Sequence, residues 1–176
     1  MSTDEALMLE FQRGSREAFD ELFARYREPL FAFYRRRLAV SARAEDLTQE
    51  TFLVVLRATE RYEPRALVRT YLYSIALKLL AGERRRQAKD SQADRAPEPV
   101  VESAAEPAIW VREALARLDA ADREILMLRE YEQLSYGEIA GLLRLPLNTV
   151  RSRLFRSRMA LKEYLEPAGK EARHVQ

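Results

Sequence analysis

The chain has 176 residues, 30 of them Lys or Arg and 28 Asp or Glu, so its formal net charge is only +2. It contains no cysteine and one histidine, His174 in a polar tail, which excludes disulfides and Cys/His zinc sites and gives Ser-His catalysis no support. Neither a P-loop, a dinucleotide-binding fingerprint nor an apolar run of the roughly 20 residues that a bilayer requires occurs. These features, with the acidic start MSTDEA, predict a cytoplasmic protein that is not an enzyme and has no cofactor, metal or membrane insertion.

The first part of the chain has helical periodicity over residues 4–12, 15–39, 43–60 and 67–87, with breaks near Gly14, at residues 40–42 and at Glu63-Pro64. A stripe of large apolar side chains at helical spacing is typical of a core. Its members are Phe11, Phe19, Leu22, Phe23, Tyr26, Leu30, Phe31 and Phe33. We therefore predict an all-helical domain over residues 1–88.

The helix AEDLTQETFLVVLRA, residues 44–58, is amphipathic. Asp46, Gln49 and Glu50 share a polar edge, while Leu47, Val54 and Leu56 are expected to turn inward. This pattern alone indicates no more than an ordinary surface helix.

Cations alternate with tyrosines in the stretch that follows. Its candidate ligand-binding residues are Arg61, Arg65, Arg69, Tyr71, Tyr73, Lys78, Arg84, Arg85 and Arg86. Such a pattern suits single-stranded nucleic acid, because cations follow the phosphates and rings stack on unpaired bases. The alternative is a buried tyrosine pair beside a basic helix end that the helix dipole stabilises. Gly82 predicts an early end or a kink in this helix.

Residues 89–108 differ in composition from their surroundings. They are acidic, contain Pro97, Pro99 and Pro107, and show no sustained period. This predicts a flexible linker that tethers two domains, so that both can engage separated sites on one ligand. The alternative is a disordered surface loop.

The second domain, predicted over residues 109–170 with a tail at 171–176, contains a helix-turn-helix pattern. Ser135 and Glu138 have capping-box spacing, Pro146 ends the first helix, and Asn148 or Thr149 is expected to cap the second. The apolar stripes of the two helices need each other as cover. They consist of Ile139, Ala140 and Leu143, and of Val150, Leu154, Leu161 and Leu165.

The second of these helices carries five cations and no acid up to Lys162, which favours duplex DNA as its ligand. The candidate contacts are Asn148, Thr149, Arg151, Ser152, Arg153, Phe155, Arg156 and Arg158. The alternative is a solvated basic helix in an ordinary helical bundle.

Together these segments resemble a family, the extracytoplasmic-function (ECF) sigma factors of the bacterial sigma-70 family. FDELFARYREPLFAFYRRRL (19–38), AEDLTQETFLVVLRA and the Tyr/Arg stretch look like the family's second conserved region in order. Residues 114–165, with DREILMLRE, LSYGEIA and TVRSRLFRSR, look like its fourth. The resemblance covers most of the chain and implies two helical domains, a region 2 bundle and a region 4 helix-turn-helix.

The resemblance implies a transcription initiation subunit with three interfaces. Core RNA polymerase would bind the helix that carries Asp46, Gln49, Glu50 and Leu53. The stretch from Arg61 to Arg86 would open the promoter −10 element and hold one strand, and the stretch from Asn148 to Arg158 would read the −35 element as duplex. An anti-sigma protein that occludes these surfaces is a further expected partner.

Several positions depart from the family's pattern, among them Gly82, where the family usually has an acidic residue. Lys78 stands where the family usually has an asparagine that handles a flipped −10 base, so base recognition does not transfer to this position. Tyr71 replaces a tryptophan and keeps a ring that can stack. Arg144 replaces a turn glycine and is mildly strained if the backbone there has positive φ, whereas Asp119 replaces a proline and suits a helix cap.

Two other functions fit parts of the sequence. A stand-alone helix-turn-helix regulator would bind duplex DNA without polymerase, but it leaves the helix with Asp46 and Glu50 unused. A sigma-like decoy would sequester an anti-sigma protein without supporting transcription.

Overall fold

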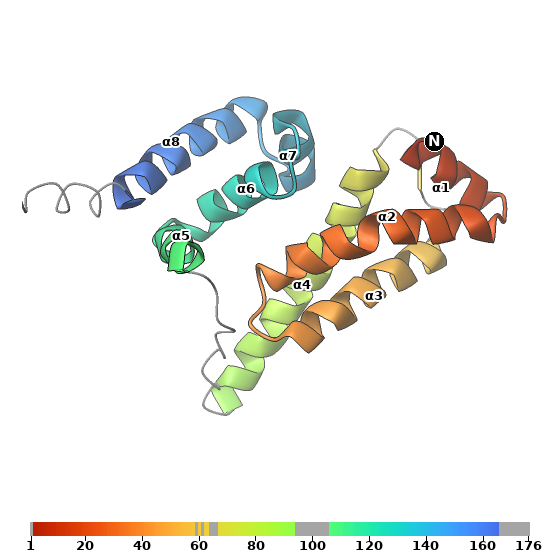
Figure 1. The fold of residues 1–176 in the computed structure, drawn as a ribbon, viewed down its shortest axis with the longest axis horizontal. Coiled ribbons are helices and arrows are strands. Elements are labelled where there is room, and N and C mark those ends of the chain that lie inside the picture. The colour runs from red at the N-terminus through yellow and green to blue at the C-terminus, as the bar shows by residue number, and fades with distance from the viewer. Residues whose placement is uncertain (1, 59, 61, 64–66, 94–105, 166–176) are drawn as a thin grey trace, which may run out of the picture. The chain divides into compact units, whose positions relative to one another are not determined.

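In the computed structural model, residues 2–58, 60, 62–63, 67–93 and 106–165 are described, and they form eight α-helices and no strand. The predicted all-α class is therefore confirmed (Figure 1). The helices fall into two compact units, Met1–Val100 and Val101–Gln176. In the described part of the chain, no helix is long and apolar enough to cross a membrane.

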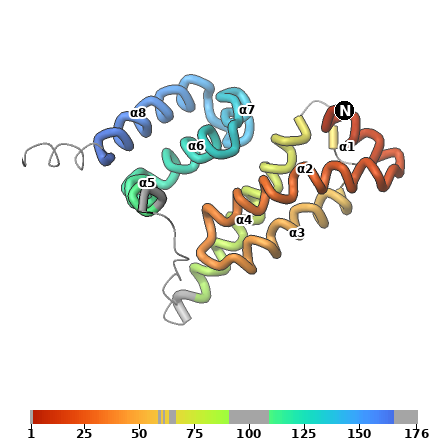
Figure 2. The backbone as a smooth tube through the Cα atoms, viewed as in Figure 1, coloured from red at the N-terminus to blue at the C-terminus, as the bar shows by residue number. Residues whose placement is uncertain are grey.

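The first unit contains α1 (Asp4–Gln12), α2 (Arg16–Arg35), α3 (Ser41–Ala58) and α4 (Val68–Ala93). Helix α2 packs against α1 and α3, and α3 packs against α4 (Figure 2). Helix α4 continues through Gly82, so the prediction of an early end there is wrong. One glycine costs about 1 kcal/mol in a helix, which is less than the burial of Leu72 and Leu80 on the same helix contributes.

The core of the first unit is built around Tyr34. Its ring is fully buried, its hydroxyl hydrogen-bonds the Thr51 hydroxyl at 2.8 Å, and it also donates to the Ala76 carbonyl at 3.3 Å. The hydroxyl therefore joins α2 to α3 and α4. Burial raises the pKa of Tyr34 well above its ordinary value, so the phenol stays protonated.

The predicted core stripe is confirmed in part. Leu22, Tyr26, Leu30 and Phe33 are buried. Phe11, Phe19, Phe23 and Phe31 are only half-buried, and the first three form a ring cluster with the buried Phe52.

The second unit contains α5 (Glu106–Ala116), α6 (Ala120–Glu130), α7 (Tyr136–Leu143) and α8 (Leu147–Leu165), and α8 packs against the other three. Two predicted caps are confirmed. The Asp119 carboxylate accepts a hydrogen bond from the Ala121 amide at 3.1 Å. Ser135 and Glu138 form the reciprocal capping box, at 3.2 and 2.8 Å.

The start of α8 differs from the prediction. The Pro146 carbonyl accepts hydrogen bonds from the amides of Thr149 and Val150 at 3.0 and 3.2 Å, so the helix begins at Leu147 and neither Asn148 nor Thr149 is its cap. Arg144, in the turn before it, has φ 54° and ψ 44°, the left-handed conformation that the family's usual glycine would favour. Ile139, Val150 and Leu154 are buried as predicted, whereas Leu165 is exposed.

Helix also extends into both ends of the predicted linker, because α4 runs to Ala93 and α5 begins at Glu106. Residues 94–105 and the predicted tail 171–176 lie outside the described residues.

Candidate nucleic-acid and protein interfaces

Helix α3 presents the polar edge that the sequence predicted. Asp46, Gln49, Glu50 and Leu53 are exposed and follow the i, i+3, i+4, i+7 spacing of one helix face, while Leu47 and its neighbours on the opposite face are buried. Leu56 is exposed as well, so the prediction that it turns inward is wrong. It lies seven residues after Gln49 and therefore close to it around the helix. The face thus combines three acidic or amide side chains with two leucines.

A buried carboxylate links α3 to α4. Glu83 of α4 is only 3% exposed and accepts a hydrogen bond from Arg43 of α3 at 2.8 Å. It also pairs with Arg86 at 3.0 Å and accepts from Gln87 at 3.1 Å. Burial by itself raises the pKa of Glu83, but the hydrogen bond and charge of Arg43 and the charge of Arg86 outweigh it, so the pKa lies below its ordinary value of 4.5. Arg43 also approaches the Asp46 carboxylate, at 3.5 Å.

The two tyrosines of the Tyr/Arg stretch have different surroundings. Tyr73 is 3% exposed and packs its ring on Phe33, with centroids 5.4 Å apart. It belongs to the core, so its prediction as a stacking platform for bases is wrong. Tyr71 is half-buried and makes an edge contact with the buried Tyr62 at 5.3 Å. Part of its ring surface therefore remains accessible.

The cations of α4 lie mainly on its surface. Lys78, Arg84, Arg85 and Arg86 are exposed and Arg69 is half-buried. Tyr71, Lys78 and Arg85 follow at intervals of seven residues, which places them along one stripe of the helix. Arg61 and Arg65 lie outside the described residues.

Helix α8 turns a polar and cationic face outward. Asn148, Arg151, Ser152, Phe155 and Arg156 are exposed, Phe155 to 67%. Arg151 contacts the Asn148 side-chain oxygen at 3.4 Å, and the Ser152 hydroxyl donates to the Thr149 carbonyl at 3.1 Å. Thr149 is half-buried at the edge of this face.

Two arginines of α8 are held within the unit. Arg153 pairs with Asp122 of α6 at 3.3 Å, and Arg158 pairs with Glu130 of α6 at 2.5 Å and donates to the Tyr136 hydroxyl at 3.2 Å. The sequence prediction missed these pairs because it sought counter-acids only within α8. Asp122 and Glu130, eight residues apart in DREILMLRE, were the available signal, since that spacing puts both on one face of α6.

No group of three or more His, Cys, Asp or Glu side chains within the described ranges is placed to hold a metal ion. The exposed charged surfaces in the described ranges include an acidic and apolar face on α3 and cationic faces on α4 and α8.

Two segments of the chain match models of conserved protein-family regions. Sigma-70 region 2 matches residues 22–90, and Sigma-70 region 4 matches residues 108–161. The RNA polymerase sigma-H factor of Pseudomonas aeruginosa is 32% identical, covering 96% of this chain and 97% of that protein. The ECF RNA polymerase sigma-E factor of Escherichia coli K12 is 31% identical, covering 94% of this chain and 95% of that protein.

Two solved structures are similar as well. CnrH, solved in complex with the cytosolic domain of CnrY, is 25% identical with a TM-score of 0.73, covering 94% of this chain and 99% of CnrH. The sigma factor RpoE of Bartonella quintana, solved with the anti-sigma factor NepR, is 23% identical with a TM-score of 0.70, covering 84% of this chain and 96% of RpoE. The chain belongs to the sigma-70 family of transcription initiation factors. Within that family it is an ECF-type sigma factor, as its sequence indicated.

Proposed function

We propose that this protein binds core RNA polymerase and directs it to a subset of promoters in the bacterial cytoplasm, without catalysing a reaction itself. The observation that carries the proposal is the combination of an acidic face on α3 with exposed cationic faces on two separate helical units. Nucleic acid binding requires the cationic faces, because phosphates attract Lys and Arg. The acidic face is unsuited to DNA and suits a basic protein surface.

Helix α3 is the proposed polymerase-binding element. Asp46, Gln49 and Glu50 supply carboxylate and amide groups for cations and amides of the partner, and the exposed Leu53 adds apolar area beside them. Replacing Asp46 and Glu50 together by Ala is expected to weaken polymerase binding at least tenfold. The matched control replaces Asp20 and Glu28, two exposed acids of α2, and should leave the affinity within about twofold. Equal losses in both double variants would contradict the α3 interface.

Helix α4 is the proposed element for the opened −10 strand. Lys78, Arg84 and Arg85 are exposed and can follow the phosphates, and the half-buried Tyr71 offers the accessible part of its ring to a base. Arg61, Arg65 and Arg69 are proposed to extend this row of phosphate-binding cations. Arg86, by contrast, forms an ion pair with Glu83.

Helix α8 is the proposed reader of the duplex −35 element. Asn148, Arg151, Ser152, Phe155 and Arg156 occupy its exposed face, near the N-terminal end that enters a major groove. Thr149 lies at the margin of that face. Arg153 and Arg158 are proposed to fix the orientation of α8 through their pairs with α6 rather than to read bases.

We propose the domain boundaries 1–88 and 109–170, with a linker over 89–108 and a tail over 171–176. On a tether, binding by one unit raises the effective concentration of the other at its own promoter element. Neither unit then needs high affinity for DNA alone, which fits the net charge of +2.

Control by an anti-sigma protein is the last part of the proposal. CnrH, whose structural match covers 94% of this chain, was solved in complex with the cytosolic domain of CnrY. A regulator that covered the exposed faces of α3 or α8 would block polymerase or promoter.

The decisive experiment is run-off transcription by core polymerase on a promoter library, with and without this protein. We expect promoter-specific transcripts only when it is present. Confirmed polymerase binding without a specific transcript on any template would sink the proposal and favour a sigma-like decoy. Tight duplex binding without polymerase would favour a stand-alone regulator.

A further inference from the structure

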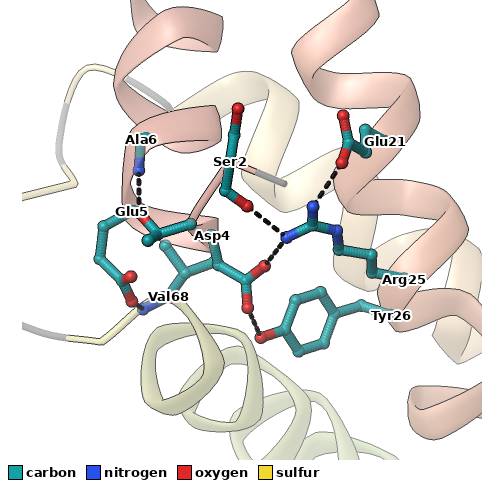
Figure 3. A network of polar contacts seen from close by, with 9 residues as sticks. Ser2, Asp4, Glu5, Ala6, Glu21, Arg25, Tyr26 and Val68 are labelled. Atoms are coloured by element: carbon teal, nitrogen blue, oxygen red, sulfur yellow. Dashed lines mark hydrogen bonds and ion pairs between the residues drawn. The ribbon is translucent and has the colours of Figure 1, made fainter.

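Helix α1 has no part in the interfaces described above, and it lies outside the span 22–90 that matches sigma-70 region 2. Its apolar side is anchored, because Leu7 and Met8 are buried. Its first two residues, Asp4 and Glu5, direct their carboxylates toward α2 and toward the start of α4 (Figure 3). Acids in the first turn stabilise α1 itself through the helix dipole. That effect does not account for the hydrogen bonds that Asp4 and Glu5 form with other helices.

Glu5 caps a helix other than its own. Its Oε1 accepts a hydrogen bond from the backbone amide of Val68, the first residue of α4, at 3.2 Å. The first four amides of a helix have no partner within that helix, and a carboxylate placed there both accepts a hydrogen bond and complements the dipole. Glu5 therefore stabilises the point at which α4 begins.

Helix α1 also contacts the segment that precedes α4. Gln12, the last residue of α1, donates its side-chain amide to the Tyr62 carbonyl at 3.0 Å. Contacts from the two ends of α1 thus lie on either side of residues 63–67. The buried Tyr62 in turn packs edge to face on Tyr71.

Asp4 fixes α1 on α2. One carboxylate oxygen accepts from Arg25 at 2.5 Å and the other accepts from the hydroxyl of the buried Tyr26. Arg25 also pairs with Glu21 and donates to the Ser2 carbonyl at 3.0 Å. The position of Glu5, the next residue, is therefore determined by α2.

We propose that Glu5, placed by the contacts of Asp4 and Gln12, is a positioning residue for promoter opening: it sets where α4 begins and how Arg69 and Tyr71 meet the opened strand. This inference rests on the proposed function, in which α4 holds that strand. Arg69 and Tyr71 lie within the first turn after Val68, so a shift of the helix start would displace both.

The test uses the full-length protein with core polymerase on a promoter recovered from the run-off library, with 2-aminopurine in its −10 element to report opening. Glu5→Ala is expected to slow opening about fivefold, the equivalent of one lost helix cap, while polymerase affinity stays within about twofold. Glu5→Gln keeps an acceptor oxygen but loses the charge, and is expected to slow opening about twofold. Glu10→Ala, which removes an exposed acid from the same helix, should open as fast as wild type.

A second control separates positioning from general destabilisation. Tyr34→Phe removes the hydroxyl contacts to Thr51 and Ala76 and is expected to lower the melting temperature without touching α1. If Glu5→Ala and Tyr34→Phe lower the melting temperature equally, promoter opening should be slower with Glu5→Ala than with Tyr34→Phe. Equal slowing, or opening by Glu5→Ala as fast as by Glu10→Ala, would overturn the inference. If Glu5→Ala does not fold, Glu5→Gln decides, and it must open more slowly than Glu10→Ala. A wild-type protein that gives no specific transcript would instead refute the proposed function.

Discussion

Both helical units hold some of their arginines in ion pairs and leave other cations on the surface, but the acids in those pairs differ in exposure. In the first unit, Arg43 and Arg86 converge on Glu83, a carboxylate that is 3% exposed. In the second unit, Arg153 and Arg158 pair with Asp122 and Glu130, which are 25% and 49% exposed. Each unit leaves other cations on the surface, Lys78, Arg84 and Arg85 in one and Arg151 and Arg156 in the other.

Because of this difference in exposure, we expect the Glu83 cluster to contribute to stability and the pairs between α8 and α6 mainly to fix side-chain orientation. A charge taken out of water is costly to leave without its partner, so the Glu83 cluster contributes to holding α3 and α4 together. The pairs between α8 and α6 stay near solvent, where an ion pair contributes little free energy but still restricts where a side chain lies. Not every cation of a basic helix is therefore available to bind DNA, because some of them form ion pairs with acids of the same unit.

The largest expected effect concerns the two exposed arginines of α8. Arg151→Ala with Arg156→Ala should lower use of promoters that depend on the −35 element about thirtyfold or more, since each base or phosphate contact contributes about 1–3 kcal/mol. Transcription from graded −35 sequences measures this effect. Arg153→Ala with Arg158→Ala is the matched control and should cost less. A double variant at 151 and 156 that lost polymerase binding would show that the interfaces are misassigned.

Next in size is the buried carboxylate. Glu83→Gln should lower the free energy of unfolding at pH 7 by about 1–3 kcal/mol, because the Arg43 guanidinium loses its nearer, buried charged partner. Since the folded pKa of Glu83 lies below its ordinary value of 4.5, its stabilising contribution is present above pH 4.5 and is lost as the pH falls through the folded value. Urea denaturation at several pH values should therefore show a smaller acid loss in the variant. Parallel curves for the two proteins would refute the role of the ionised carboxylate.

A smaller effect is expected from the backbone of the turns. The turn between α1 and α2 has a glycine at positive φ, Gly14 at 101°, whereas the turn between α7 and α8 has Arg144 at 54°. Arg144→Gly should raise the free energy of unfolding by about 0.5–1 kcal/mol, because glycine adopts this conformation without steric strain. Thermal unfolding checks the prediction, with Arg144→Ala as the control that keeps the strain. A stabilised Ala variant would point to the charge instead.

The smallest effect should come from the exposed acid of the second unit. Glu130→Gln is expected to cost about 0.5 kcal/mol or less, and the difference should shrink at high salt. Measuring it beside Glu83→Gln tests the comparison directly. A loss as large as that of the Glu83 variant would show that solvent exposure does not separate the two clusters.

Some expectations from sequence were confirmed because they depend on local pattern. The helices of both units, the capping box at Ser135 and the cap at Asp119 follow from periodicity and short-range hydrogen bonding. Others were wrong for equally local reasons. Neither Asn148 nor Thr149 caps α8, because the helix already starts at Leu147, and Leu56 faces outward because its position around the helix matches that of Gln49.

The sequence by itself determined the class of fold, the family, and which helices carry charge, because helix periodicity and the motifs of regions 2 and 4 are written in consecutive residues. Only the tertiary structure decided which charged and aromatic side chains remain accessible. Tyr73 and Tyr71 are two residues apart, yet one is buried against Phe33 and the other is half-exposed. Arg153 is held by an acid 31 positions away in the chain, and Glu5 reaches an amide 63 positions away. Such contacts depend on how helices pack, and no local pattern records them.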